Sequence, residues 1–142
     1  MKTRNFKALG AAAALLFSLG GASTANAFSV TQGLGFPATA TDVYQFLCPV
    51  GTASARGFVV DAPPVGAPLI RLLLFKGGLL VTAEAPQEGT SPQVTLTGGA
   101  GLYEAFITKT AAGSEVYTTR IECISATGAI LPAAGPVQTQ NQ

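Results

Sequence analysis

The stretch that decides the fold is residues 42–48, Asp42-Val43-Tyr44-Gln45-Phe46-Leu47-Cys48. In an extended strand successive side chains point to opposite sides, so Tyr44, Phe46 and Cys48 share one side and the residues between them share the other. This alternation predicts a half-buried β-strand, which Pro49-Val50-Gly51 ends.

Six further stretches rich in β-forming residues follow, bounded by turns that contain proline or glycine. Residues 69–75 would also suit a helix, but the run is short and lies between Pro68 and Gly77, so we expect a strand. About seven short strands without a helical period predict an all-β fold, a single antiparallel β-sandwich. The six stretches are residues 53–61, 69–75, 79–84, 93–97, 102–108 and 115–124.

The N-terminus carries the pattern of a secretory signal peptide. Lys2, Arg4 and Lys7 form a basic start, an apolar stretch runs from residue 8 to about residue 21, and Ala25-Asn26-Ala27 supplies small residues for cleavage. The apolar stretch is shorter than the roughly 20 residues that span a bilayer. We therefore expect cleavage after Ala27 and a periplasmic or extracellular mature chain without a transmembrane segment.

The expected organisation has four parts. Residues 1–27 form the signal peptide, residues 28–41 a loose lead-in, residues 42–126 the sandwich, and residues 127–142 a flexible tail rich in proline and glutamine. Without the signal peptide, five basic residues face seven acidic ones, a net charge of about −2. So few cations cannot form the basic stripe that nucleic acid requires, which argues against nucleic acid as a partner.

The two cysteines, Cys48 and Cys123, are expected to form one structural disulfide, as an isolated even pair does in an oxidising compartment. Over residues 115–124, turning Arg120 and Glu122 outward turns Cys123 inward, and Cys48 shares the aromatic side of the first strand. Both sulfurs therefore point to the core, and the first and last of these strands are expected to be near neighbours. A metal site or a redox pair is not expected, because the chain has no CxxC motif and no histidine.

Four segments carry a family resemblance: Asp42-Val43-Tyr44-Gln45-Phe46, Leu72-Leu73-Leu74-Phe75-Lys76-Gly77-Gly78, Gly99-Ala100-Gly101-Leu102-Tyr103-Glu104-Ala105-Phe106-Ile107 and Val116-Tyr117-Thr118-Thr119-Arg120-Ile121. In order and spacing they resemble the bacterial pre-peptidase C-terminal domain, over residues 41–123. The resemblance implies a small jelly-roll-like sandwich of the kind usually found beside secreted proteases. No protease accompanies it in this chain, and the central segment lacks the acidic residues often present there. The resemblance therefore carries over neither calcium binding nor collagen binding.

No catalytic constellation is visible in the sequence. Without histidine, Ser–His–Asp, Cys–His and ordinary zinc sites are excluded. Gly98-Gly99-Ala100-Gly101 precedes a strand rather than a helix, which predicts a turn rather than a phosphate-binding loop. No spacing selects a pair of acidic residues for catalysis, and we expect acids on turns and at outward strand positions to be solvated. Calcium would need acids that are scattered in the sequence, such as Asp42 and Glu84, to meet on folding. No catalytic residue, metal ligand or cofactor is predicted.

One pattern remains, an apolar second side on three strands. On each of them, the side that carries a charged residue also carries large apolar residues. A strand with one solvent-exposed face is not expected to show this pattern. Three interpretations are open. Loops or the lead-in cover these residues, bulges shift the register of the strands, or these residues form an exposed patch for docking or self-association. The residues of this predicted interaction face are Phe58 and Val60 beside Arg56, Leu73 and Phe75 beside Arg71, and Phe106 beside Glu104.

The function expected from these features is that of an exported, non-enzymatic domain that binds an unknown protein or cell-surface partner. The alternative is a self-associating structural subunit of an extracellular assembly, whose partner is a second copy of the chain. A carbohydrate-binding or hydrolase accessory is a third reading.

Overall fold

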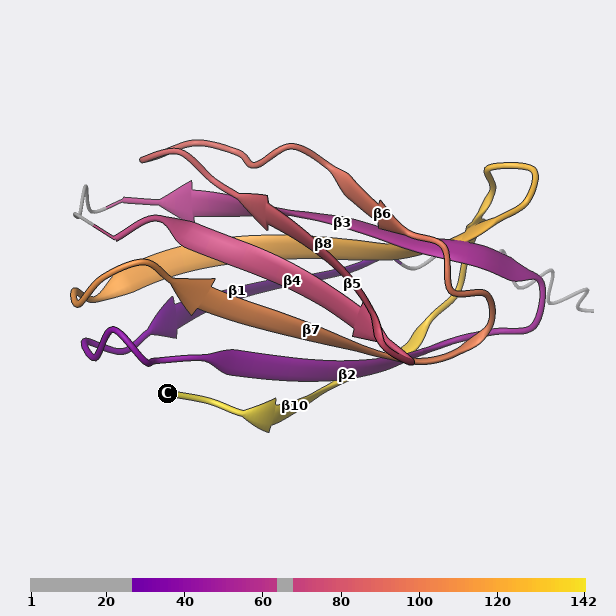
Figure 1. Ribbon diagram of the computed structural model, residues 1–142, viewed down its shortest axis with the longest axis horizontal. Helices are drawn as coiled ribbons and strands as arrows, with labels where there is room; N and C mark the ends of the chain where they lie inside the picture. Colours follow the sequence, from indigo (N-terminus) through magenta and orange to yellow (C-terminus); the bar gives the residue numbers. More distant parts are fainter. Residues whose placement is uncertain (1–26, 64–67) are drawn as a thin grey trace, which may run out of the picture.

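The structure is a computed structural model that describes residues 27–63 and 68–142. The expected signal peptide lies outside the described residues, apart from Ala27. Within the described ranges, no helix is long and apolar enough to cross a membrane. The chain forms two antiparallel five-stranded sheets that pack face to face, which confirms the predicted β-sandwich (Figure 1).

The strands divide between the two layers in an order that differs from their order along the chain. Sheet A has the order β1-β8-β3-β6, with β9 beside β8, and sheet B has the order β10-β2-β7-β4-β5. In sheet A the strands are β1 (Phe28–Leu34), β8 (Glu115–Ser125), β3 (Thr52–Ala62), β6 (Val94–Leu96) and β9 (Ile130–Leu131). In sheet B they are β10 (Ala134–Gln140), β2 (Asp42–Cys48), β7 (Gly101–Lys109), β4 (Ile70–Lys76) and β5 (Leu79–Glu84).

The seven expected strands are all present, and three more strands lie in segments where none was expected. The lead-in contains β1, whose Phe28 and Leu34 are buried, and the expected tail contains β9 and β10. The predictions of a loose lead-in and a flexible tail are therefore wrong for these strands. The physical reason is that β1 pairs with β8 and buries Phe28 and Leu34 in the core, whereas β10, which has few apolar side chains, is ordered by backbone pairing with β2.

The disulfide between Cys48 and Cys123 is confirmed, and it joins the two sheets. Its Cα atoms lie 5.6 Å apart, and both cysteines are buried. β2 and β8 therefore face each other across the core, whereas the partners of β2 within its sheet are β10 and β7. Closing a loop with a sequence separation of 75 stabilises the fold by about 4 kcal/mol in the chain-entropy model.

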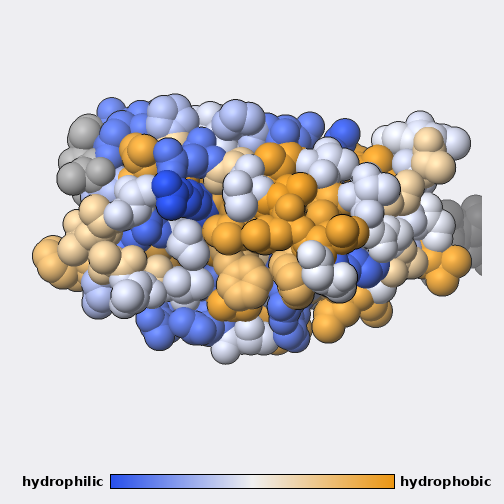
Figure 2. Space-filling model, in the orientation of Figure 1, coloured by the Kyte–Doolittle hydropathy of each residue, from blue (hydrophilic) through white to orange (hydrophobic). Residues whose placement is uncertain are grey.

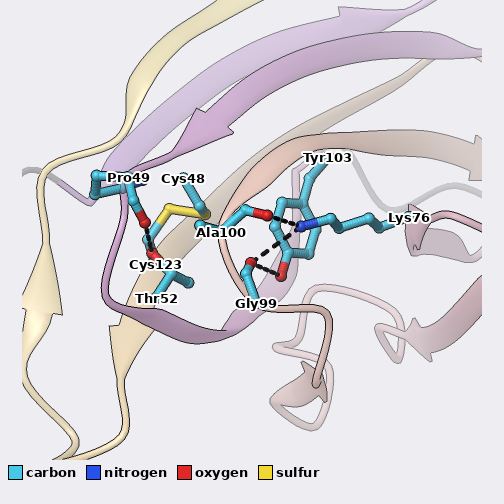
Figure 3. The surroundings of a disulfide bond; sticks show 8 residues. All are labelled: Cys48, Pro49, Thr52, Lys76, Gly99, Ala100, Tyr103 and Cys123. Atoms are coloured by element: carbon cyan, nitrogen blue, oxygen red, sulfur yellow. Dashed lines mark hydrogen bonds between the residues drawn. A yellow bond between two sulfur atoms is a disulfide. The ribbon is translucent and has the colours of Figure 1, made fainter.

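The turn that follows β6 is fastened beside the disulfide (Figure 3). The Lys76 ammonium lies 4.4 Å from the centre of the Tyr103 ring and donates hydrogen bonds to the carbonyls of Gly99 and Ala100. The Tyr103 hydroxyl also donates to the Gly99 carbonyl, at 2.7 Å. This segment thus presents carbonyls to a lysine, in keeping with the predicted turn rather than with an anion-binding loop.

Candidate interaction surface

The structure divides the predicted interaction face between the two layers. Phe58 and Val60 lie on β3 in sheet A, whereas Leu73, Phe75 and Phe106 lie on β4 and β7 in sheet B. All five point away from the core, but the outer faces of the two sheets point in opposite directions. The prediction of one shared face is therefore wrong. Alternation along a strand shows which residues share a side, but it does not show which layer the strand joins.

The outer face of sheet A is largely polar. Phe58 lies directly opposite Arg120, and Val60 lies opposite Thr118. Glu122 accepts hydrogen bonds from Arg56 at 2.6 Å and from Arg120 at 2.7 Å. The two apolar residues are thus separated by charged and hydroxyl groups, as on an ordinary solvated sheet face.

The outer face of sheet B is apolar across several strands. Phe106 lies opposite Val43 on one side and Leu73 on the other, and Phe75 lies opposite Leu80. Figure 2 shows the resulting hydrophobic area, drawn in orange, over the region where Figure 1 places β4, β5 and β7. We call this surface the sheet-B face and define it by seven residues: Val43, Leu47, Leu73, Phe75, Leu80, Leu102 and Phe106.

Three leucines of the sheet-B face are about half exposed. The exposed fraction is 49% for Leu47, 53% for Leu80 and 54% for Leu102. Leu47 and Leu102 lie opposite each other on β2 and β7, so their exposed areas adjoin. Burying these side chains would remove apolar area from water, which is the main driving force of protein association.

Polar groups lie within the sheet-B face and at one end of it. The Gln45 side chain donates a hydrogen bond to Glu104 at 3.0 Å in its interior. At one end, Arg71 and Glu84 form a salt bridge at 2.5 Å beside a hollow of about 500 Å³. The hollow is lined by Arg71, Leu73, Thr82, Ala83, Glu84 and Thr108. A partner would therefore meet an apolar band with a charged pair at one end.

A second group of polar residues is enclosed between the sheets. Tyr44 and Tyr117 share a hydrogen bond of 2.6 Å between their hydroxyls, and Tyr117 donates to the Asp42 carboxylate at 2.6 Å. Burial raises the pKa of both tyrosines. Asp42 is fully buried. Its position on the aromatic side of β2 was a signal in the sequence that pointed to this placement.

Charged groups also lie buried where β3 ends and β8 begins. Lys109 donates to the carbonyls of Gly35, Phe36 and Gly113. Both carboxylate oxygens of Glu115 are buried without a hydrogen-bond partner among the described residues. Burial and the nearby Asp61 raise the pKa of Glu115, while burial lowers the pKa of Lys109. Among the described residues, no group of three histidine, cysteine, aspartate or glutamate side chains is placed to hold a metal ion.

Comparison with known proteins adds no relative to this description. No protein-family model matches the chain, and no curated protein matches it.

Proposed function

We propose that this chain is an exported, non-catalytic β-sandwich domain that binds a protein or cell-surface partner through the sheet-B face. The observation that carries the proposal is the contiguous apolar surface formed by β2, β4, β5 and β7 on the side of sheet B turned away from the core. The outer face of a sandwich sheet is ordinarily polar, and contiguous exposed apolar areas mark sites of interaction.

Export is supported by two independent features. The sequence of residues 1–27 has the order of a secretory signal peptide, and the disulfide between Cys48 and Cys123 is of a kind that persists in oxidising compartments. A secreted sandwich domain is also what the resemblance to the pre-peptidase C-terminal domain implies. We place the working protein in the periplasm or outside the cell.

A binding role also fits the placement of the ionisable groups. Asp42, Asp61 and Glu115 are at most 3% exposed, so a substrate in solution cannot reach their side chains. The acids on the sheet-B face are engaged with neighbours, Glu84 with Arg71 and Glu104 with Gln45. Neither pair has the arrangement of two opposed carboxyl groups that glycoside hydrolysis uses.

Site-specific photo-crosslinking in the producing cells tests the proposal. A photoreactive phenylalanine derivative placed at Leu102 samples the sheet-B face. The same group at Ser29, on the outer side of sheet A, and at Val50, which is 95% exposed in a turn, provides matched controls. We expect a discrete covalent adduct from Leu102 and none from the two controls. Equal adduct formation at all three positions, or at none, would contradict a binding role for the sheet-B face.

A further inference from the structure

The outward edge of β5 has main-chain groups directed away from its neighbour β4. Ala85 donates its backbone N–H to the carbonyl of Ile70 at 2.9 Å. Because alternate residues of a strand direct their main-chain groups to the same side, Val81 and Ala83 also face β4. The N–H and C=O groups of Leu80, Thr82 and Glu84 therefore point to the other side. Within the described residues, no strand pairs with β5 on that side.

Apart from the charge of Glu84 at its end, this edge lacks the features that keep exposed strands from pairing. β5 has the sequence Leu79-Leu80-Val81-Thr82-Ala83-Glu84, which contains no proline and no lysine. Its six residues pair with β4 in an unbroken register, without a bulge. Exposed edges are commonly blunted by a lysine, a proline, a bulge or a short length, and β5 has none of these.

The other three sheet edges among the described residues differ from β5. β10 contains Pro136 and two register shifts, and β6 has only three residues and closely follows Pro92. β1 is longer, but Ser29, Thr31 and Gly33 on its outer side give an added strand almost no apolar area to bury. β5 is therefore the edge that combines an open ladder with an apolar side.

The open edge is continuous with the sheet-B face. Leu80 lies opposite Phe75, so a strand added beyond β5 would extend both the hydrogen-bonded ladder and the apolar surface. Leu79 and Leu80 are each about half exposed, at 49% and 53%. Main-chain hydrogen bonds then supply affinity, and the side chains on the outer side supply specificity.

We propose that two copies of this chain associate by antiparallel pairing of β5 with β5 of the second copy, which joins the two B sheets into one. The proposal rests on the proposed role of the sheet-B face and names its partner. Residues directly opposite in an antiparallel pair share one face, which allows Thr82 to lie opposite Thr82 on a two-fold axis. Leu80 then lies opposite Glu84 of the second copy, so no like charges face each other.

The self-pairing has specific physical support in this register. A threonine pair on the axis is a favourable cross-strand pair, and it lies within an uncharged stretch that ends only at Glu84. Glu84 is already neutralised by Arg71. The pairing would set Leu80 of each copy beside Glu84 of the other, at the two ends of the paired stretch, and a two-fold arrangement closes on itself as a dimer.

The solution mass of the exported, oxidised protein tests the pairing, measured by size exclusion with light scattering over a concentration range. We expect a dimer, and we expect Thr82→Lys to lose it, because the substitution sets two lysines opposite each other on the axis. The Thr82 side chain is exposed, so the melting temperature at low concentration should not change. Thr31→Lys, at an exposed position of edge strand β1, is the matched control and should remain dimeric.

A cysteine variant tests the register directly. Thr82→Cys places two Cα atoms about 5.5 Å apart across the axis, within the range that a disulfide spans. We expect a covalent dimer from Thr82→Cys and none from Thr31→Cys. A protein that stays monomeric at all concentrations overturns the pairing, as does a dimer that Thr31→Lys abolishes and Thr82→Lys does not. A monomer that still forms a crosslinked adduct at Leu102 with another molecule overturns the pairing alone and leaves the proposed function standing.

Discussion

Phe106 of β7 and Leu73 of β4 lie directly opposite each other on the outer face of sheet B, on the side away from the core. Val43 of β2 lies on the other side of Phe106, so three neighbouring strands contribute adjoining apolar side chains to this surface. None of these three side chains belongs to the buried core of the sandwich. Their placement is the structural basis for proposing that the sheet-B face binds a partner.

Substitution of exposed leucines on the sheet-B face should weaken binding and leave the fold intact. Leu47 and Leu102 are opposite each other and about half exposed, so Leu47→Ser together with Leu102→Ser removes apolar contact area at little cost to the core. We expect loss of the photo-crosslinked adduct at a nearby position of the face, and a change in the free energy of unfolding within about 1 kcal/mol. Denaturant unfolding and crosslinking yield measure the two effects.

Phe58→Ser is the matched control for the two leucine substitutions. Phe58 lies on the outer face of sheet A, opposite Arg120. We expect crosslinking from the sheet-B face to be unchanged in this variant. If Phe58→Ser abolished the adduct while the leucine variant retained it, the binding surface would belong to sheet A.

Removing the disulfide should cost a large part of the stability. Cys48→Ala with Cys123→Ala releases a loop with a sequence separation of 75, and the free energy of unfolding should fall by about 4 kcal/mol. Equilibrium unfolding of the oxidised protein and the double variant gives the difference. A difference of under about 1 kcal/mol would show that the link between β2 and β8 contributes little beyond the packing around it.

The buried hydroxyl chain predicts unequal costs for two similar substitutions. Tyr117→Phe removes the donor to Asp42 and the acceptor for Tyr44, whereas Tyr44→Phe leaves the bond between Tyr117 and Asp42 in place. Because an unpaired buried polar group costs about 1–3 kcal/mol, Tyr117→Phe should lower the free energy of unfolding by more than Tyr44→Phe does. Thermal or denaturant unfolding of both variants checks the order, and the reverse order would contradict this hydrogen-bond chain.

Glu115 predicts a pH dependence with a defined sign. Burial raises the pKa of the Glu115 carboxyl group in the folded protein above its value in the unfolded chain, which is about 4.3. The free energy of unfolding therefore falls as the pH rises through the pKa that Glu115 has in the folded protein. Glu115→Gln removes this loss and should stabilise the protein by about 1 kcal/mol at pH 7, with the difference vanishing near pH 4. Lys109 keeps its three carbonyl acceptors in the variant, and Asp61 is present in both proteins.

Unfolding curves across this pH range, for the parent and for Glu115→Gln, give the measurement. A variant less stable than the parent at pH 7 would show that the charge of Glu115 is required by Lys109. The pairing of these two groups would then outweigh the burial of the carboxylate.

Local patterns in the sequence predicted the strands that carry apolar alternation. They also predicted that the side chains of both disulfide cysteines point to the core. The alternation of Tyr44, Phe46 and Cys48 is a property of one strand, and the charged residues beside Cys123 turn its side chain inward in the same way. β1 and β10 were missed because the backbone of a neighbouring strand orders them, and that neighbour is distant in the sequence. Pairing of this kind leaves only a weak local signal.

The candidate site was predicted in part for a related reason. Phe75 and Phe106 were identified as outward apolar residues, but Phe58 was grouped with them although β3 belongs to the other layer. Leu80 and Leu102, which are more exposed than the phenylalanines, were not singled out. The strand of Leu80 shows no clear conflict between its two sides, whereas Leu102 shares the outward side of β7 with Glu104 and Phe106 and could have been identified with them. Which strands share a sheet depends on contacts between distant segments, and alternation does not encode it.

Amide hydrogen exchange of the exported protein, compared between its dilute and its associated state, directly tests self-association through β5. We expect association to slow exchange in β5, at Leu80, Thr82 and Glu84, while exchange in the edge strands β1 and β6 stays unchanged. Slower exchange in β1 or β6 with none in β5, or no change in any strand, would contradict self-association through the β5 edge.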